Sequence, residues 1–152
     1  MFFRLLRLSV VLGVVVCGRA ADLVSSGDWN QSINATHLVS GAGSNLQPQF
    51  ESVAGVTVLT ISNAPGAWTL RARLTGSGGH GNVTIHVRRA SAGSGPGDIS
   101  GGTTYQALSG SDAELFSGTE ARSGISLQIK ITGLSCQVSP ATYLSSISFT
   151  VQ

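Results

Sequence analysis

Charged side chains are scarce in this chain of 152 residues, at 11% of the total. So low a charge content is unusual for a cytosolic enzyme, and it offers nucleic acid no broad basic surface. Apolar residues, at 41%, are nevertheless too numerous for a disordered chain. The composition therefore predicts one folded domain that is large enough to bury a core without covalent staples.

Helical periodicity is also missing, because no stretch repeats its apolar residues at spacings of three and four. This excludes βαβ folds and the nucleotide-binding motifs that need a helix N-terminus. What the chain has instead is 20 glycines and many Ser, Thr and β-branched residues. These favour an extracellular all-β protein.

The first 20 residues have the three parts of a secretory signal. MFFRLLR is basic, LSVVLGVVV is apolar, and CGRA supplies small residues for cleavage. The apolar run is roughly half of the ~20 residues that a membrane span needs. We therefore predict a signal peptide over 1–20, cleavage near Ala20 or Ala21, and one β-sandwich domain over 21–152 that is secreted, periplasmic or at the cell surface. The alternative is lipid attachment at Cys17, although Val16 stands where lipoprotein signals usually have Gly or Ala.

Loss of the signal changes the charge and the cysteine content. Arg4, Arg7 and Arg19 leave with it, so nine basic residues become six against seven acidic ones, and the net charge moves from +2 to −1. Cys136 is then the single cysteine, which excludes an intramolecular disulfide. We expect Cys136 to be a small buried side chain, with an intermolecular bridge or a reactive thiol as the alternatives.

Three consecutive strands are predicted over 56–62, 67–74 and 82–89. AWTLRARL and NVTIHVRR alternate apolar with polar residues, as a strand with one buried face does. VTVLTIS is apolar on both sides and is expected nearer the middle of a sheet. The turn sequence Asn63-Ala64-Pro65-Gly66, with Gly66 at a positive φ, predicts a hairpin between the first two strands.

Shorter strands are expected in the rest of the chain. Residues 33–40 form a weak candidate; the later strands are placed at 103–109, 113–118, 124–133 and 142–152; and Gly-rich loops are placed at 41–52, 76–82 and 91–102. Seven or eight short strands predict an all-β, antiparallel two-sheet β-sandwich, with a small barrel as the alternative. Its predicted core includes Trp68, Leu70, Val83, Ile85, Val87, Leu127, Ile129, Ile147 and Phe149.

The separation of charges along the chain is the main functional signal. No acidic residue lies between Glu51 and Asp98, although this interval holds four of the six basic residues that follow the signal. If strands 67–74 and 82–89 pair, one exposed face carries Arg71, Arg73, His86 and Arg88. Like charges opposite one another cost stability unless they are widely spaced or have a compensating partner. We expect a solvated face, with binding of an anionic glycan or surface polymer, or of an acidic protein partner, as the alternative.

Sequence motifs for catalysis or metal binding are missing. The histidines lack the spacing of a helical metal motif, and the serines lie in Gly-Ser turns without a nucleophile elbow. We expect the acidic residues of the later loops to be solvated, with Ca²⁺ binding as the alternative. These residues are Asp98, Asp112, Glu114 and Glu120. We therefore predict no catalytic residue, no metal site and no cofactor.

Several stretches resemble a known group of proteins. These are THLVSGAGSNLQPQFES, VRRASAGSGPGDISGGTTYQ, ELFSGTEARSGISLQIKITGL and SPATYLSSISFTVQ. Together they are similar to exported bacterial β-sandwich surface proteins of the pilin and spore-coat type. The resemblance covers most of residues 21–152 and implies an extracellular structural or surface role, but it transfers no functional residue.

The sequence thus leaves three classes of function, in this order: a structural surface protein that self-assembles and has no catalytic activity, a carbohydrate- or ligand-binding module, and a small secreted enzyme.

The closing strand, from Tyr143 to the C-terminus, has neither charge nor Pro to protect its edge. Residues 22–32, with Leu23 and Trp29 as anchors, are a candidate strand for a neighbouring copy. The alternatives are that they pair within their own domain or are disordered. Contact with a membrane is expected only through the signal or through a lipid on Cys17.

Overall fold

The computed structural model describes residues 6–8, 21–75, 82–138 and 141–152, which contain twelve strands and one short 3-10 helix. One sheet holds β1 (Leu6–Leu8), β3 (Trp29–Gln31), β6 (Ala67–Thr75), β8 (Ile99–Gly101), β10 (Ala113–Thr119) and β12 (Leu144–Val151). The other holds β2 (Asp22–Ser26), β4 (Gln49–Glu51), β5 (Thr57–Ser62), β7 (Thr84–Arg89), β9 (Gln106–Ala107) and β11 (Arg122–Thr132). The 3-10 helix η1 spans Ala35–His37.

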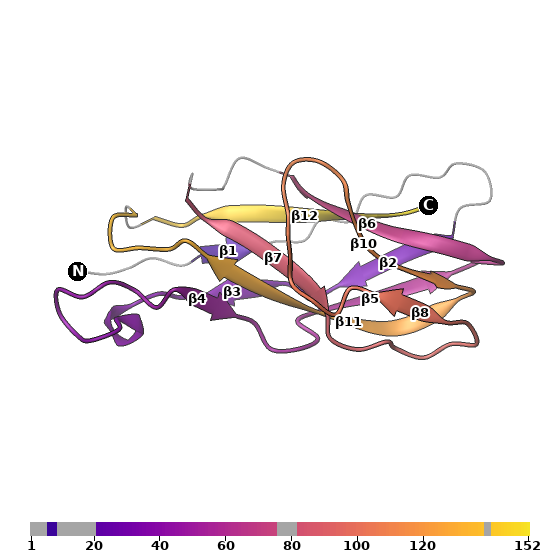
Figure 1. Ribbon diagram of the computed structural model, residues 1–152, viewed down its shortest axis with the longest axis horizontal. Helices are drawn as coiled ribbons and strands as arrows, with labels where there is room; N and C mark the ends of the chain where they lie inside the picture. Colours follow the sequence, from indigo (N-terminus) through magenta and orange to yellow (C-terminus); the bar gives the residue numbers. More distant parts are fainter. Residues whose placement is uncertain (1–5, 9–20, 76–81, 139–140) are drawn as a thin grey trace.

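The strands form two sheets around one core, with the orders β3-β1-β12-β6-β10-β8 and β2-β5-β11-β7-β9. The short strand β4 pairs with β11 beyond the end of β5. All pairings are antiparallel except that of β1 with β12, which is parallel. The predicted antiparallel two-sheet β-sandwich is therefore confirmed, with more and shorter strands than the seven or eight expected (Figure 1).

The core lies between the sheets and consists of the inward-facing alternate residues of each strand. Ile125, Leu127, Ile129 and Ile131 of β11 are all at most 1% exposed, and Leu70 and Ala72 of β6 are fully buried opposite them. Every residue of the predicted core is buried except Val83, which packs against its margin. Period-two patterning thus located the core correctly, because alternate side chains of a strand point to opposite faces.

The hairpin predicted between 56–62 and 67–74 is wrong, and the strands at 67–74 and 82–89 do not pair with each other either. β5 and β7 belong to one sheet and β6 to the other, so the chain crosses between sheets after β5 and again after β6. In the first crossing the positive φ, +53°, is at Asn63 rather than at Gly66. The strands take partners far away in sequence instead: β6 lies between β10 and β12, and β5 lies between β2 and β11. The connection over 76–81 lies outside the described residues.

Several short segments also differ from expectation. Residues 33–40 contain η1 rather than a strand, because the Asn34 side chain accepts the Thr36 N–H at 3.0 Å and caps the turn. The loops placed at 41–52 and 91–102 contain β4 and β8. The strand placed at 103–109 shrinks to β9, whereas those placed at 113–118, 124–133 and 142–152 are present as β10, β11 and β12.

Candidate functional site: a cationic and aromatic cluster

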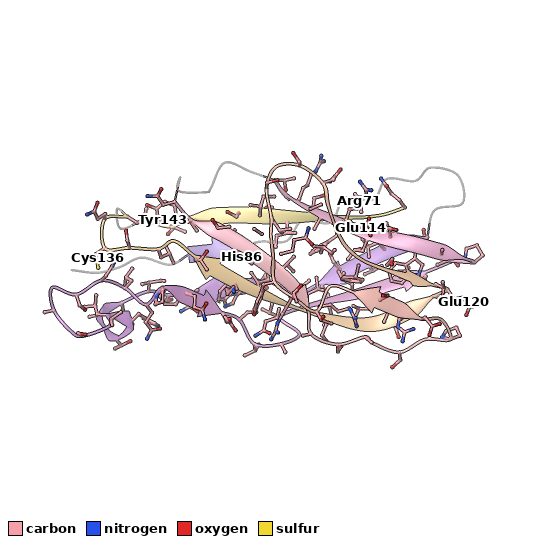
Figure 2. The ribbon with its side chains drawn as sticks, in the orientation of Figure 1. Arg71, His86, Glu114, Glu120, Cys136 and Tyr143 are labelled. Carbon is pink, nitrogen blue, oxygen red and sulfur yellow. The ribbon has the colours of Figure 1, made fainter. Side chains whose placement is uncertain are left out.

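The predicted four-residue cationic face is divided between the two sheets. Arg71 and Arg73 lie on β6, whereas His86 and Arg88 lie on β7. Figure 2 shows Arg71 and His86 on separate strands. The predicted face required these two strands to pair, and they do not, so the four residues do not form one surface.

Acidic neighbours accompany the two arginines of β6. The Asp112 carboxylate Oδ1 lies 3.7 Å from Nε of Arg73, and Glu114 is the cross-strand neighbour of Arg71 (Figure 2). Both acidic residues come from β10 or the turn before it, far from β6 in sequence. The outer face of this sheet therefore carries compensated charges.

The outer face of the other sheet gathers cations around an aromatic ring. The guanidinium carbon Cζ of Arg88 lies 4.7 Å from the centroid of the Tyr105 ring, and Nζ of Lys130 lies 4.2 Å from it. Both distances are within the range of a cation–π interaction. We call this group the Tyr105 cluster, and it consists of Glu51, His86, Arg88, Tyr105, Gln128 and Lys130.

Strand register explains how this cluster forms. Gln128 stands opposite Arg88, and Lys130 stands opposite His86 on one side and Glu51 on the other. These residues alternate with the buried residues of β7 and β11, so they share the outer face. Tyr105 comes from the segment just before β9, which pairs with β7 through Gln106 and Ala107.

Hydrogen bonds fix the Arg88 side chain. Its Nε and Nη2 both donate to Oε1 of Gln128, at 3.0 and 2.7 Å. Gln128 Nε2 in turn donates to the Ser52 carbonyl at 2.8 Å. The guanidinium is thus held in one orientation by a chain of bonds that ends on the backbone.

Burial changes the acid–base properties of two members. It raises the pKa of the Tyr105 phenol, and the neighbouring Glu51 carboxylate raises it further, while Arg88 acts in the opposite direction. Tyr105 therefore stays neutral at physiological pH. Burial also lowers the pKa of His86, with Lys130 as the second cause. Nε2 of His86 lies 3.0 Å from Oγ1 of Thr132.

Sequence reasoning found only His86 and Arg88 of this cluster. The outward pattern of GISLQIKITG already placed Gln128 and Lys130 on an exposed face, so a signal for them existed. Nothing in the sequence pointed to Tyr105 or Glu51, because each reaches the cluster through strand pairing with a distant segment.

The described residues hold no group of three or more His, Cys, Asp or Glu side chains that could bind a metal ion. Asp112 and Glu114 face the arginines of β6. Asp98 and Glu120 both lie at the other end of β10, beyond the pairing of Gly118 with Ile99. His37 lies in η1, and its ring packs on the Phe50 ring at a centroid distance of 5.4 Å. His80 lies outside the described residues.

Cys136 is exposed, which corrects the expectation of a small buried side chain. Its thiol lies 3.3 Å from the Ser44 carbonyl, and its backbone N–H donates to the Asn45 side chain at 3.1 Å. The residue follows β11 in an irregular turn, where no alternation carries its side chain into the core. The intermolecular bridge and the reactive thiol remain predictions.

Comparisons with known proteins do not identify a family for this chain. No family model and no curated protein matches the chain. Among solved structures it is similar to chitosan-binding module 1 of a chitosanase/glucanase from Paenibacillus sp. IK-5, at 14% identity over 88% of this chain and 95% of that one. The TM-score is 0.24, too low to carry an argument about fold or function. No helix among the described residues is long and apolar enough to cross a membrane.

Proposed function

We propose that residues 21–152 form a secreted or cell-surface structural protein that has no catalytic activity and assembles through the free edge of β12. One observation supports this proposal: β12 accepts a strand, β1, that belongs to the predicted signal peptide. In the processed protein this strand is gone, and the edge is left for another chain.

The geometry of the edge favours such pairing. β1 pairs with β12 only at Leu144 and Ser145, so the edge from Ser146 to Val151 carries no partner strand among the described residues. The Gln152 N–H and the Thr69 carbonyl are bonded at 3.1 Å, with the reciprocal bond at 2.8 Å. Because antiparallel bonds alternate along a strand, the N–H of the residue before Gln152 points away from β6. The edge thus presents free donors and acceptors, without Pro or charge to block them.

The partner that we propose is a second copy of the same chain, joined through antiparallel pairing of the two β12 strands. Such a contact is self-complementary and closes as a twofold dimer. The predicted donor, residues 22–32, is less suitable because its first part is paired within its own domain, where Leu23 stands opposite Ile61 on β5. Trp29 is moreover buried in the core.

Size-exclusion chromatography with light scattering on residues 21–152 tests this assembly. We expect a concentration-dependent dimer that Ser148→Lys dissociates, because a lysine on each paired edge brings like charges together. Ser117→Lys is the matched control, since Ser117 is on the same outer face but on β10, which already has neighbours on both sides. A monomer at all concentrations, or equal dissociation by both variants, would contradict the proposal.

The Tyr105 cluster favours a second function, that of a carbohydrate- or ligand-binding module. Two cations held against an aromatic ring on an exposed sheet face are groups that anionic ligands bind. This function is compatible with the first because the cluster and β12 lie on different sheets.

A further inference from the structure

We propose that the Tyr105 cluster is a binding site for an anionic polysaccharide, whose carboxylate or sulfate groups lie against Arg88 and Lys130. This site goes beyond the assembly through β12 and does not depend on it. It also differs from the surface expected from the sequence, because its second cation comes from β11 and its aromatic residue from the segment before β9.

Both cations are held in place before any ligand binds. Arg88 is fixed by its two bonds to Gln128, and the Tyr105 ring lies against both positive groups. Long basic side chains normally lose conformational entropy when they bind a ligand, and fixing them beforehand reduces that cost. A preformed pair of cations is therefore a better anion site than two mobile surface lysines.

The cations also keep binding capacity. The Lys130 ammonium donates no hydrogen bond and forms no ion pair within the part of the chain that the structure describes. Arg88 has five N–H donors, of which Gln128 takes two, and the Tyr105 hydroxyl is a further partner. Glu51 is the cross-strand neighbour of Lys130 and is the one acidic member of the cluster. Two cations against one carboxylate leave a local charge of +1, to which His86 adds when it is protonated.

The surface around the cluster suits a saccharide better than a peptide. The outward residues of β7 and β11 are Thr84, His86, Arg88, Ser126, Gln128, Lys130 and Thr132, all of them polar. Among the described residues, the exposed large apolar side chains are Val24, Val39, Val53 and Leu144. None lies on these strands, and only Val53, which follows Ser52, is next to a residue bonded to the cluster. A protein partner usually needs an apolar centre in its interface, whereas hydroxyl and amide groups match the hydroxyls of a sugar chain.

Affinity electrophoresis of residues 21–152 in gels containing polygalacturonate tests the site, with neutral dextran and poly-glutamate as comparison polymers. The double variant Arg88→Gln/Lys130→Gln should bind polygalacturonate at least about tenfold more weakly, because it loses two charge-assisted contacts. The matched control Arg71→Gln/Arg73→Gln removes the same charge from the opposite sheet and should change binding by less than about twofold. Circular dichroism verifies the fold of each variant.

If the double variant fails to fold, Lys130→Gln alone supplies the test, because the ammonium it removes makes no hydrogen bond in the described structure. Added salt should weaken binding, since attraction between exposed charges is largely screened beyond the Debye length, which is about 8 Å at physiological ionic strength. Unchanged binding by the cluster variants, equal loss in the control, or equal retention on dextran would overturn the proposal. Tighter binding to poly-glutamate would identify an acidic protein partner and would overturn it too.

The assembly variant separates this site from the proposed dimer. Ser148→Lys should bind polygalacturonate as well as the unmodified protein does, because β12 is in the other sheet. Binding lost together with the dimer would show that the ligand needs the assembly and that the Tyr105 cluster alone is insufficient.

Discussion

At the scale of single residues, Gly118 shows how closely the core is packed around Trp68. The Trp68 ring meets Phe116 edge-on, with a centroid separation of 6.3 Å, and its Nε1 donates to the Glu120 carbonyl at 2.8 Å. Gly118 is in register with Trp68 on the adjacent strand. The indole lies over the glycine because no side chain separates them.

We therefore expect Gly118→Ala to destabilise the protein by about 1–3 kcal/mol through overpacking. The added Cβ would meet the Trp68 ring and would lie 2.7 Å from the Asp98 carbonyl oxygen. Gly110→Ala is the matched control, because nothing lies within 4 Å of its Cβ position. Urea denaturation of both variants measures the difference, and equal midpoints would contradict the packing described for Trp68.

His86 gives stability a dependence on pH. Burial, and after it Lys130, lowers the pKa of His86 in the folded state, so the unfolded chain takes up a proton more readily. The stabilising contribution is therefore present above the unfolded pKa of about 6.5 and is lost as the pH falls through the lower folded pKa.

We expect the urea midpoint of unfolding to be lower at pH 5 than at pH 7.5, and this decrease to be smaller in His86→Gln. The His86 ring also contacts the Thr132 hydroxyl, and the glutamine amide is able to take the place of the ring as the partner of that hydroxyl. His37→Gln is the control for the loss of a histidine elsewhere in the chain, since His37 lies in η1 and not in the sheet that contains His86. An identical pH dependence in His86→Gln and the unmodified protein would exclude this role.

At the scale of elements, interruptions of regular pairing shape both sheets. The β10 register with β6 shifts between Glu114 and Phe116, so consecutive residues Leu115 and Phe116 are both buried. A bulge of this kind adds one residue to a strand and turns its side chain to a face that alternation would not give. Strict period two would place Phe116 or Leu115 in the core, but not both, and the core predicted from the sequence contained neither.

β11 shows a second interruption, because one of its edges serves two strands in succession. β5 pairs with residues up to Leu127, and β4 pairs from Lys130 onward. Between them the chain leaves the sheet, and the Ser52 and Gly55 N–H groups donate to the Ile129 and Leu127 carbonyls, both at 2.9 Å. This detour brings Glu51 beside Lys130 and thereby completes the Tyr105 cluster.

At the scale of the whole molecule, the two halves of the chain share both sheets. β11, from the second half, lies between β5 and β7 of the first, and β6, from the first half, lies between β10 and β12 of the second. Each half alone would expose strand edges and apolar faces on every sheet that it contributes to. Folding is expected to be cooperative over the entire domain.

We predict that fragments 21–90 and 91–152, made separately, remain unfolded, because neither retains a complete pair of sheets. Near-ultraviolet circular dichroism at the two tryptophans of the first fragment reports its tertiary packing. The intact domain, denatured in parallel, provides the reference signal. A cooperative unfolding transition in either fragment would show that a smaller unit is stable.

The sequence by itself determined the strand class, the position of the long strands and the core. It did so because inward and outward side chains alternate along β6, β7, β11 and β12, and that pattern needs no knowledge of partners. It also marked the outward residues of β6, β7 and β11 correctly, His86 and Arg88 among them. All of this information is local to each strand.

Which strands are neighbours was decided only by the tertiary structure. A strand with one apolar face pairs equally well with many others, so the turn sequence at Asn63 to Gly66 predicted a hairpin where the chain instead crosses between sheets. Because β6 and β7 lie in different sheets, Arg71 and Arg73 are separated from Arg88. The pairing of β7 with β11 and β9 brings Lys130 and Tyr105 to Arg88 instead. The composition of a surface depends on the register of distant strands, and this register is set by how both sheets close around a common core.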